Sequence, residues 1–119
     1  MALETTIQHI QADTAVISFS GNLTLGMGLS MADSQIQSLI EKGVCRMVFD
    51  MTTVPYIDSS GLGVLVHTYG LTLLKGGMLR LCCVNERVTA LLKMTKMDAV
   101  LSVDGDASTS LAAINSPVR

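Results

Sequence analysis

The sequence predicts an α/β fold in which residues 1–119 form one domain, with a small, largely parallel sheet flanked by about four helices. Two observations predict this fold. Short apolar runs typical of strands alternate with longer segments that carry apolar residues at intervals of three or four. Most of these segments are bounded by glycine, proline, aspartate or asparagine. Strands that alternate with helices need crossover connections, which favour parallel pairing.

The chain opens with two strand-like segments. Residues 5–11 alternate weakly between apolar and polar side chains, and residues 14–20 form a stronger β-branched run. Asp13 lies between them, where a hairpin turn is expected, so the pair would add an antiparallel edge to the sheet. Gly21 ends the second strand, and a loop with breakers at Gly26 and Gly28 follows.

The remaining elements alternate in type. A helix over 29–43 is predicted by one apolar stripe, and Gly43 is a natural stop. The segment 44–51 is apolar almost throughout, which predicts a strand at the centre of the sheet. The other elements expected are a loop at 52–58, helices at 59–74, 86–95 and 106–114, strands at 78–84 and 99–103, and a frayed tail at 115–119.

Composition and charge exclude several classes of function. The net charge is −2 and 3% of residues are aromatic, so the chain has neither a basic stripe nor base-stacking platforms for nucleic acid. No apolar run approaches the roughly 18 residues of a membrane span, and the N-terminus lacks signal-peptide features. We therefore expect a cytoplasmic protein that binds no nucleic acid and does not insert into membranes.

The three cysteines, Cys45, Cys82 and Cys83, lie within apolar runs and show no C-x-x-C spacing. An odd set of this kind predicts buried thiols rather than a disulfide or a metal site. Neither a metal nor a cofactor is expected.

The segment YIDSSGLGVLV, residues 56–66, is the most distinctive in the chain. A hydrolase would need a base near Ser59, but His67 lies on the same helix about 12 Å farther along at 1.5 Å per residue. His9 has no orienting acid in view and is expected to be an exposed strand residue. A nucleotide cradle is disfavoured because Val66 stands where the third glycine of G-x-G-x-x-G belongs. Serine hydrolysis and nucleotide binding are therefore both disfavoured.

Helix capping explains only part of this segment. Asp58, Ser59 and Ser60 are all favourable N-cap residues. Gly61 and Gly63 fit less well, because glycine inside a helix costs up to about 1 kcal/mol relative to alanine. Two glycines in the first turn indicate that something approaches this turn closely.

The helix expected at 59–74 has apolar residues on both faces. The predicted core face consists of Leu62, Leu65, Val66, Tyr69 and Leu73. The opposite face holds Ser60, Val64, His67, Leu71 and Leu74. This second face is either a partner-binding surface or packs under a neighbouring helix, and the pattern leaves both alternatives open.

A hydroxyl at this helix N-terminus suits regulatory phosphorylation. The helix dipole and the N–H groups of the first turn accommodate an anion, so the fold would survive the modification. A phosphate adds about −1.5 to −2 charges, which beside Asp58 and an apolar docking face would oppose partner binding.

The longer segment FDMTTVPYIDSSGLGVLV resembles the central signature of STAS domains, and most closely that of bacterial anti-sigma factor antagonists. In those proteins the signature reads roughly D-L-x-x-V-x-x-[IM]-D-S-[ST]-G-L-G. The residues that fill it here are Asp50, Val54, Ile57, Asp58, Ser59, Ser60, Gly61, Leu62 and Gly63. The spacing from Gly21 to Asp58 agrees as well, and residues 75–98 look like the family's next strand and helix.

This resemblance implies a small mixed sheet flanked by helices, and a partner-switching mechanism. The unphosphorylated protein would bind an anti-sigma factor that is also a serine kinase, and so release the sigma factor. Phosphorylation of Ser59, or less favourably of Ser60, would end this binding. A metal-dependent serine phosphatase would then reset the protein. The resemblance therefore implies a protein that is not an enzyme.

The expected partner surface surrounds this serine. Asp58 is expected to shape the loop and cap the helix, while Gly61 and Gly63 let the partner approach. The other residues predicted to bind the partner are Thr24, Ser60, Val64, His67 and Leu71.

Two alternatives change the function. Many family members have an acid where Thr24 stands, and this departure favours a non-switching STAS subunit of a lipid-transport ATPase complex or a stress-signalling scaffold. A different class, a small-molecule-binding module that uses the Gly-rich loops, would bind a metabolite and need no protein partner.

Overall fold

The computed structural model describes residues 2–115, and its elements follow the predicted order. The strands are β1 (Glu4–Gln11), β2 (Thr14–Ser20), β3 (Arg46–Thr53), β4 (Met78–Cys82) and β5 (Ser102–Asp104). The helices are α1 (Met27–Glu41), α2 (Ser59–Leu74), α3 (Glu86–Met94), the short 3-10 helix η1 (Met97–Ala99) and α4 (Ala107–Asn115). The predicted α/β fold with a hairpin at its start is confirmed.

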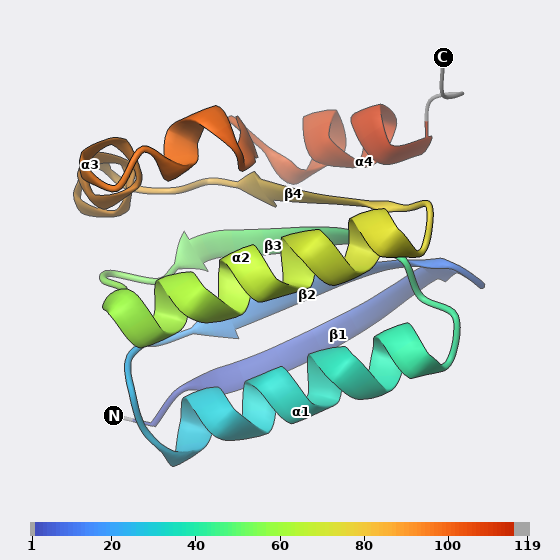
Figure 1. Ribbon diagram of the computed structural model, residues 1–119, viewed down its shortest axis with the longest axis horizontal. Coiled ribbons are helices and arrows are strands. Elements are labelled where there is room, and N and C mark those ends of the chain that lie inside the picture. The colour runs from blue at the N-terminus through green and yellow to red at the C-terminus, as the bar shows by residue number, and fades with distance from the viewer. Residues whose placement is uncertain (1, 116–119) are drawn as a thin grey trace.

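The sheet is largely parallel and has one antiparallel edge (Figure 1). Its strand order is β1-β2-β3-β4-β5; β1 pairs antiparallel to β2, and the other neighbours pair in parallel. The apolar strand β3 occupies the centre, as its sequence predicted. The parallel strands therefore end at the same edge of the sheet, and the loops that follow β2 and β3 emerge there together.

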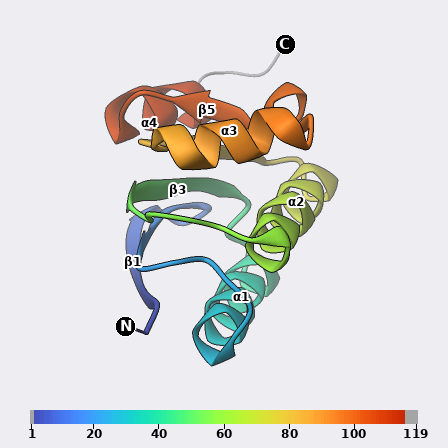
Figure 2. The same ribbon diagram turned by 90° about the vertical axis from the view of Figure 1, so that its left-hand side faces the viewer.

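Helices cover the two faces of the sheet unequally. Figure 2 shows α1 and α2 on the same side of the sheet. The main core forms on that side, between these helices, α3 and strand residues such as Ile17, Phe49 and Leu81. A smaller cluster on the opposite face joins Val48 and Cys82 to Ile114 of α4. Consecutive strand residues point to opposite faces, so β2, β3 and β4 each contribute to both clusters.

The helix α1 begins earlier than predicted. It starts at Met27 instead of Leu29, with Gly26 as its N-cap. Gly28 therefore lies inside the helix and not in a loop, where a Cβ would come within 3.1 Å of the Leu3 Cβ. The glycine leaves room for the N-terminal segment, a contact that no local pattern indicates.

The predicted strand at 99–103 is only partly a strand. Residues 97–99 form η1, because the N–H groups of Val100 and Leu101 donate to the Met97 carbonyl. Only β5 follows as strand.

The C-terminal prediction is also corrected at one position, since Asn115 closes α4 instead of fraying. The rest of the predicted tail, residues 116–119, lies outside the described residues. Within residues 2–115, no helix combines the length and apolar character that crossing a bilayer requires.

Candidate functional site

The loops after β2 and β3 are joined to each other beside the N-terminus of α2. The Leu23 N–H donates to the Tyr56 carbonyl at 3.1 Å, and the Asp58 N–H donates to the Leu23 carbonyl at 3.2 Å. These bonds form an isolated parallel bridge between Leu23 and Ile57, whose side chains are both buried. The two loops therefore act as one short extension of the sheet.

Asp58 connects this extension to both helices. Its Oδ1 accepts from the Gly61 N–H at 2.9 Å, which caps α2, and its Oδ2 accepts from the Leu25 N–H at 2.9 Å. The Leu25 and Gly61 N–H groups lower the pKa of the Asp58 carboxyl, so it is ionised at neutral pH. The structure confirms that Asp58 caps the helix and shapes the loop.

Ser59 is the first residue of α2 and is exposed to solvent. Ser60, the less favoured phosphorylation site, is half-buried. The Asp58 cap holds the Ser59 backbone at the positive end of the helix dipole. An accessible hydroxyl on a rigid backbone can accept a phosphoryl group without rearrangement of the core.

A second support for the loop comes from α3, and the sequence did not reveal it. The Asn85 side-chain amide donates to the carbonyls of Val54 at 3.2 Å and Pro55 at 3.0 Å. Its Oδ1 also accepts from the Val88 N–H at 2.8 Å, so Asn85 is the N-cap of α3 as well. The Arg87 guanidinium lies over the Tyr56 ring, 4.8 Å from its centroid. An asparagine before a helix signals a cap, but nothing in the sequence indicates that it also holds a distant loop.

The two glycines of the first turn have different surroundings. Gly61 is buried, and a Cβ there would lie 2.0 Å from the Leu23 carbonyl oxygen. We expected Gly61 to give room to a partner, but the structure gives that room to the loop after β2. Gly63 is exposed with nothing within 4 Å of a built Cβ, so a partner can approach there.

The buried line of α2 differs from the predicted core face. Its buried residues are Gly61, Leu65, Thr68 and Thr72. Of the predicted core residues only Leu65 is buried, Leu62, Val66 and Tyr69 are half-buried, and Leu73 is 51% exposed. Apolar residues surround this helix, so the periodicity did not distinguish its faces. Thr72 tolerates burial because its hydroxyl donates to the Tyr69 carbonyl at 2.9 Å.

The face predicted for partner binding is divided by its contact with α1. Ser60, Gly63, Val64 and His67 line a shallow groove of about 320 Å³ together with Leu29, Ser30 and Asp33 of α1. Leu71 is not in this groove; it packs against the main core, as Val64 also does. Leu71 therefore belongs to the packed side of α2 and not to the groove.

Asp33 is a groove residue that the sequence analysis missed. Its Oδ2 accepts from Gln37 at 3.1 Å, but its buried Oδ1 has no hydrogen-bond partner among the described residues. A buried oxygen without a hydrogen-bond partner is costly to the folded state. An acid on the polar side of a predicted helix carries no signal for this position.

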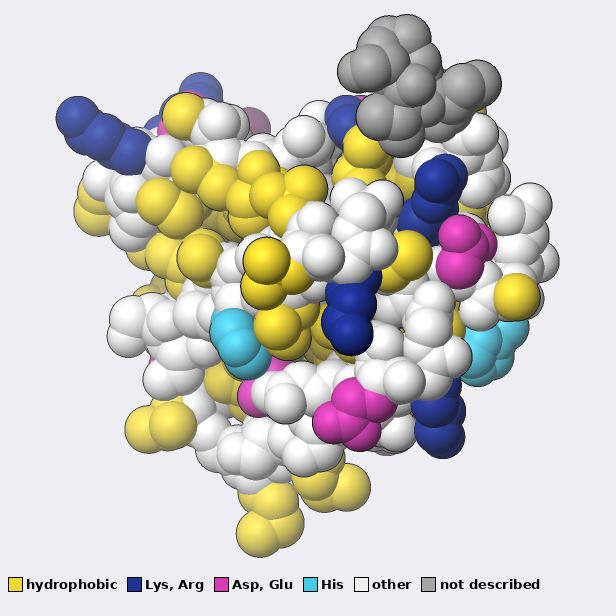
Figure 3. Space-filling view, turned by 45° about the vertical axis from the view of Figure 1, so that its right-hand side comes forward, with side chains coloured by type: hydrophobic (Ala, Val, Ile, Leu, Met, Phe, Trp, Pro, Cys, Tyr) yellow, Lys and Arg dark blue, Asp and Glu magenta, His cyan; other side chains and the backbone are white. Residues whose placement is uncertain are grey.

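An exposed apolar patch beside the loop was also missed. Leu25 and Met27 are each 80% exposed, and Met31 is 61% exposed. Figure 3 shows hydrophobic side chains projecting at its lower edge, where α1 lies. Thr24, half-buried, precedes this patch in the loop that is bonded to Asp58. An apolar docking face near the serine was expected on α2, and this patch adds exposed apolar side chains from the loop before α1 and from α1 itself.

The cysteines partly follow the prediction. Cys82 is buried, whereas Cys45 and Cys83 are half-buried, and all three are free. His9 is an exposed strand residue, as expected. Among residues 2–115, one group has the composition and spacing to hold a metal ion, namely Asp50, Cys82 and Cys83. It includes no residue of the serine loop.

Comparison with known proteins agrees with this geometry. Residues 5–111 match the model of the STAS domain family. An anti-sigma F factor antagonist of Paenibacillus polymyxa is 29% identical over 104 residues, which cover 87% of each chain.

Solved structures share the fold. A protein of Thermotoga maritima, provisionally assigned as an anti-sigma factor antagonist, superposes with a TM-score of 0.86 at 20% identity, covering 94% of this chain and 95% of its own. The Bacillus cell fate determinant SpoIIAA in its phosphorylated form superposes with a TM-score of 0.75 at 12% identity, covering 94% of this chain and all of its own.

Proposed function

Because the chain belongs to the STAS domain family, we propose that it is an anti-sigma factor antagonist whose partner binding is ended by phosphorylation of Ser59. In this role it binds an anti-sigma factor with serine kinase activity, and a metal-dependent phosphatase restores the binding form. It acts in the cytoplasm as a ligand and a substrate rather than as an enzyme. The named function of the Paenibacillus relative supports the partner class.

The observation that carries this proposal is the placement of Ser59. It is exposed at the start of α2, and the preceding Asp58 is hydrogen-bonded to both Gly61 and Leu25. A kinase can therefore reach the hydroxyl, while the backbone that carries it stays fixed. Phosphorylation of SpoIIAA, which has the same fold, supports a role for modification here.

Charge is the reason that phosphorylation would end binding. The patch of Leu25, Met27 and Met31 is apolar, and its loop is bonded to the ionised Asp58. A phosphate on Ser59 adds about −1.5 to −2 charges next to that carboxylate. A partner that buries the apolar patch would have to desolvate this charge, which lowers its affinity.

The groove between α1 and α2 extends the proposed surface. Ser60, Gly63, Val64 and His67 reach it from α2, and Asp33 reaches it from α1.

The proposal is tested with purified anti-sigma factor kinases from the same bacterium. Ser59→Ala should bind such a kinase as the unmodified protein does and should not be phosphorylated in the presence of ATP. Ser59→Asp should bind at least about tenfold more weakly, which corresponds to about 1.4 kcal/mol. Calorimetry measures the affinities, and mass spectrometry locates the phosphate.

Ser60→Ala is the matched control for the site of modification, and it should still be phosphorylated, at Ser59. Met27→Gln should weaken binding, whereas Leu74→Gln, at the other end of α2 and 83% exposed, should not. Equal affinity of Ser59→Ala and Ser59→Asp for every such kinase would exclude the switch.

The non-switching alternative rests on Thr24, which stands where many relatives have an acid. Stable binding to a transporter ATPase or a signalling scaffold, unchanged in Ser59→Asp, would support that alternative. The metabolite-binding alternative predicts instead that a nucleotide or metabolite raises the melting temperature and that no protein partner binds.

A further inference from the structure

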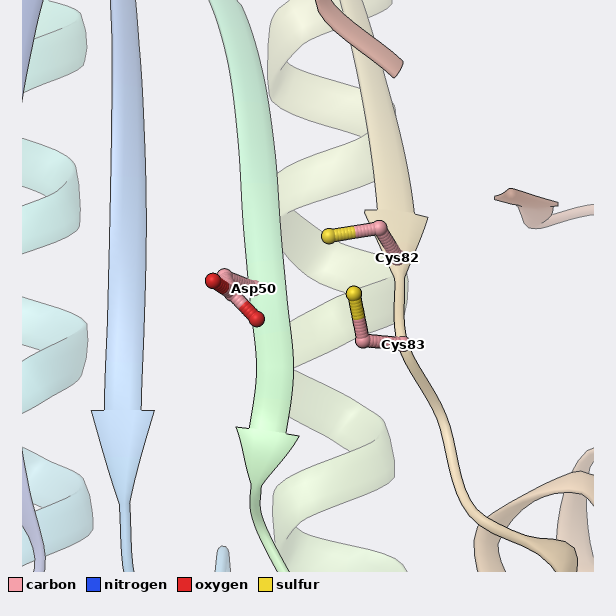
Figure 4. A group of neighbouring side chains, drawn as sticks. All are labelled: Asp50, Cys82 and Cys83. Carbon is pink, nitrogen blue, oxygen red and sulfur yellow. The ribbon is translucent and has the colours of Figure 1, made fainter. Parts of the chain in front are cut away.

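The carboxyl ends of β3 and β4 bring together three side chains that the proposed switch does not use. Asp50, Cys82 and Cys83 each offer one ligand atom, and these atoms all lie within 4.8 Å of one another. Figure 4 shows the Cys82 sulfur directed from the end of β4 toward Asp50 on β3, and the Cys83 sulfur directed toward that of Cys82. Asp50 and Cys82 are direct partners in the parallel register, which explains their proximity.

Adjacent cysteines on one strand would normally point to opposite faces of a sheet. Cys82 is the last residue of β4, and Cys83 follows it with a φ of 66°, in the left-handed region. The Cys83 N–H donates to the Asp104 carbonyl at 3.1 Å, which holds this conformation against β5. Few residues with side chains adopt a left-handed backbone, and here it turns the Cys83 sulfur back toward that of Cys82.

The carboxylate is oriented by its own hydrogen bonds. Asp50 Oδ1 accepts from the Thr52 N–H at 3.0 Å and from the Thr52 hydroxyl. No hydrogen bond of the described residues involves Oδ2 of Asp50. Outer hydrogen bonds of this kind fix metal-binding carboxylates in place and leave the second oxygen for the ion.

We propose that Asp50, Cys82 and Cys83 bind one thiophilic divalent cation, of which zinc is the biological example to test. Two sulfur ligands and one carboxylate suit zinc, and they do not suit magnesium or calcium, which prefer oxygen. Zinc binds sulfur at about 2.3 Å and carboxylate oxygen at about 2.1 Å, so ligand atoms in a tetrahedral site lie roughly 3.5 to 3.8 Å apart. Side-chain rotations that move the ligand atoms by about 1 Å would therefore bring all three into contact with the ion. The fourth coordination position of the tetrahedral site would remain open.

The cation would join three strands at one edge of the sheet. Asp50 belongs to β3, Cys82 belongs to β4, and Cys83 is bonded to Asp104 of β5. A ligand that binds only the folded chain raises its apparent stability. The expected consequence is a higher melting temperature in the presence of zinc.

The first test uses Co²⁺ as a spectroscopic probe on the full chain kept reduced. We expect one Co²⁺ per chain, a sulfur-to-cobalt charge-transfer band, and loss of that band when Zn²⁺ is added. Cys83→Ser and Asp50→Asn should each weaken the cobalt affinity at least about tenfold, since each removes one of three ligands. These two variants are preferred to Cys82→Ser, because Cys82 is buried and its replacement can affect folding.

Cys45→Ser is the matched control. Cys45 is half-buried like Cys83, but its carbonyl pairs with Met78 at the start of β4, at the opposite end of that strand. Its replacement should leave the band and the zinc-dependent melting shift unchanged. Absence of the band in the reduced wild type, a band that persists unchanged in Cys83→Ser, or its loss in Cys45→Ser would overturn the proposal.

Discussion

The two helices that flank the groove begin in different ways. α2 starts after Asp58, whose own side chain accepts the Gly61 N–H. α1 starts after Gly26, which forms no side-chain cap. The loop before α1 is instead held by its neighbour, because the Leu25 N–H donates to the same Asp58 carboxylate.

This difference shows that Asp58 supports both parts of the candidate surface, the start of α2 and the loop before α1. The apolar patch at the start of α1 depends on a carboxylate that belongs to α2. Ser59, the proposed phosphoacceptor, is the next residue in the chain. A charge added at Ser59 therefore lies beside the group that positions both the cap and the patch.

The largest effect is expected where the two loops approach α2 most closely. Gly61→Ala would place a Cβ 2.0 Å from the Leu23 carbonyl oxygen, so the loop or the helix must move. We expect a loss of about 3 kcal/mol in the free energy of unfolding, at the upper end for overpacking. Urea denaturation measures it.

Gly63→Ala is the control on the same helix turn. Nothing lies within 4 Å of its Cβ position, and alanine favours helix, so this variant should be stabilised by up to about 1 kcal/mol. Similar losses in both variants would show that the close contact with Leu23 is not what requires a glycine.

A smaller effect is expected from removing the shared carboxylate. Asp58→Ala loses the cap of α2, worth about 1 kcal/mol, and a hydrogen bond to the loop before α1, worth about as much again. The free energy of unfolding should fall by about 2 kcal/mol, and anti-sigma factor binding should weaken as well. Denaturation and calorimetry measure the two effects.

Asp106→Ala gives the comparison, because the Asp106 carboxylate accepts the Thr109 N–H at 2.7 Å at the start of α4 and forms no hydrogen bond with another loop among the described residues. It should reduce stability less and leave binding unchanged. If Asp106→Ala weakened binding as much as Asp58→Ala does, Asp58 would have no specific role in forming the docking surface.

The smallest expected effect is a pH dependence of the free energy of unfolding that comes from Asp58. The Leu25 and Gly61 N–H groups hold the pKa of Asp58 below that of the unfolded chain, about 3.9. Ionised Asp58 therefore stabilises the fold above that value, and the contribution disappears as the pH falls through the lower pKa of the folded state.

The measurement is the difference in unfolding free energy between wild type and Asp58→Asn over a pH series. The difference should be constant above about pH 5 and should shrink in more acidic solution. Asp104, whose pKa is lowered by Arg80, contributes equally to both proteins and cancels. A difference that did not change with pH would mean that the charge of Asp58 is unimportant.

Local patterns were sufficient for most of the fold. The order of elements, the central position of β3 and the buried stripe of α1 all follow from residues close together in the chain. The caps at Asp58 and Asn85 were predictable for the same reason, since a cap involves residues only three positions apart. Thus the sequence by itself determined the architecture and the place of the serine at a helix start.

Only the tertiary structure decided what surrounds that serine. The bond from Leu25 to Asp58, the support of Pro55 by Asn85, and the groove with Asp33 all join residues distant in the chain. The buried face of α2 was also decided by the tertiary structure. Apolar residues lie on every side of this helix, so only its packing partners determine which side is buried. The convergence of Asp50 with the two cysteines was decided in the same way, since it depends on the register of β3 with β4 and on the left-handed turn at Cys83. Contacts of this kind depend on how the elements pack, and no periodicity along the chain encodes them.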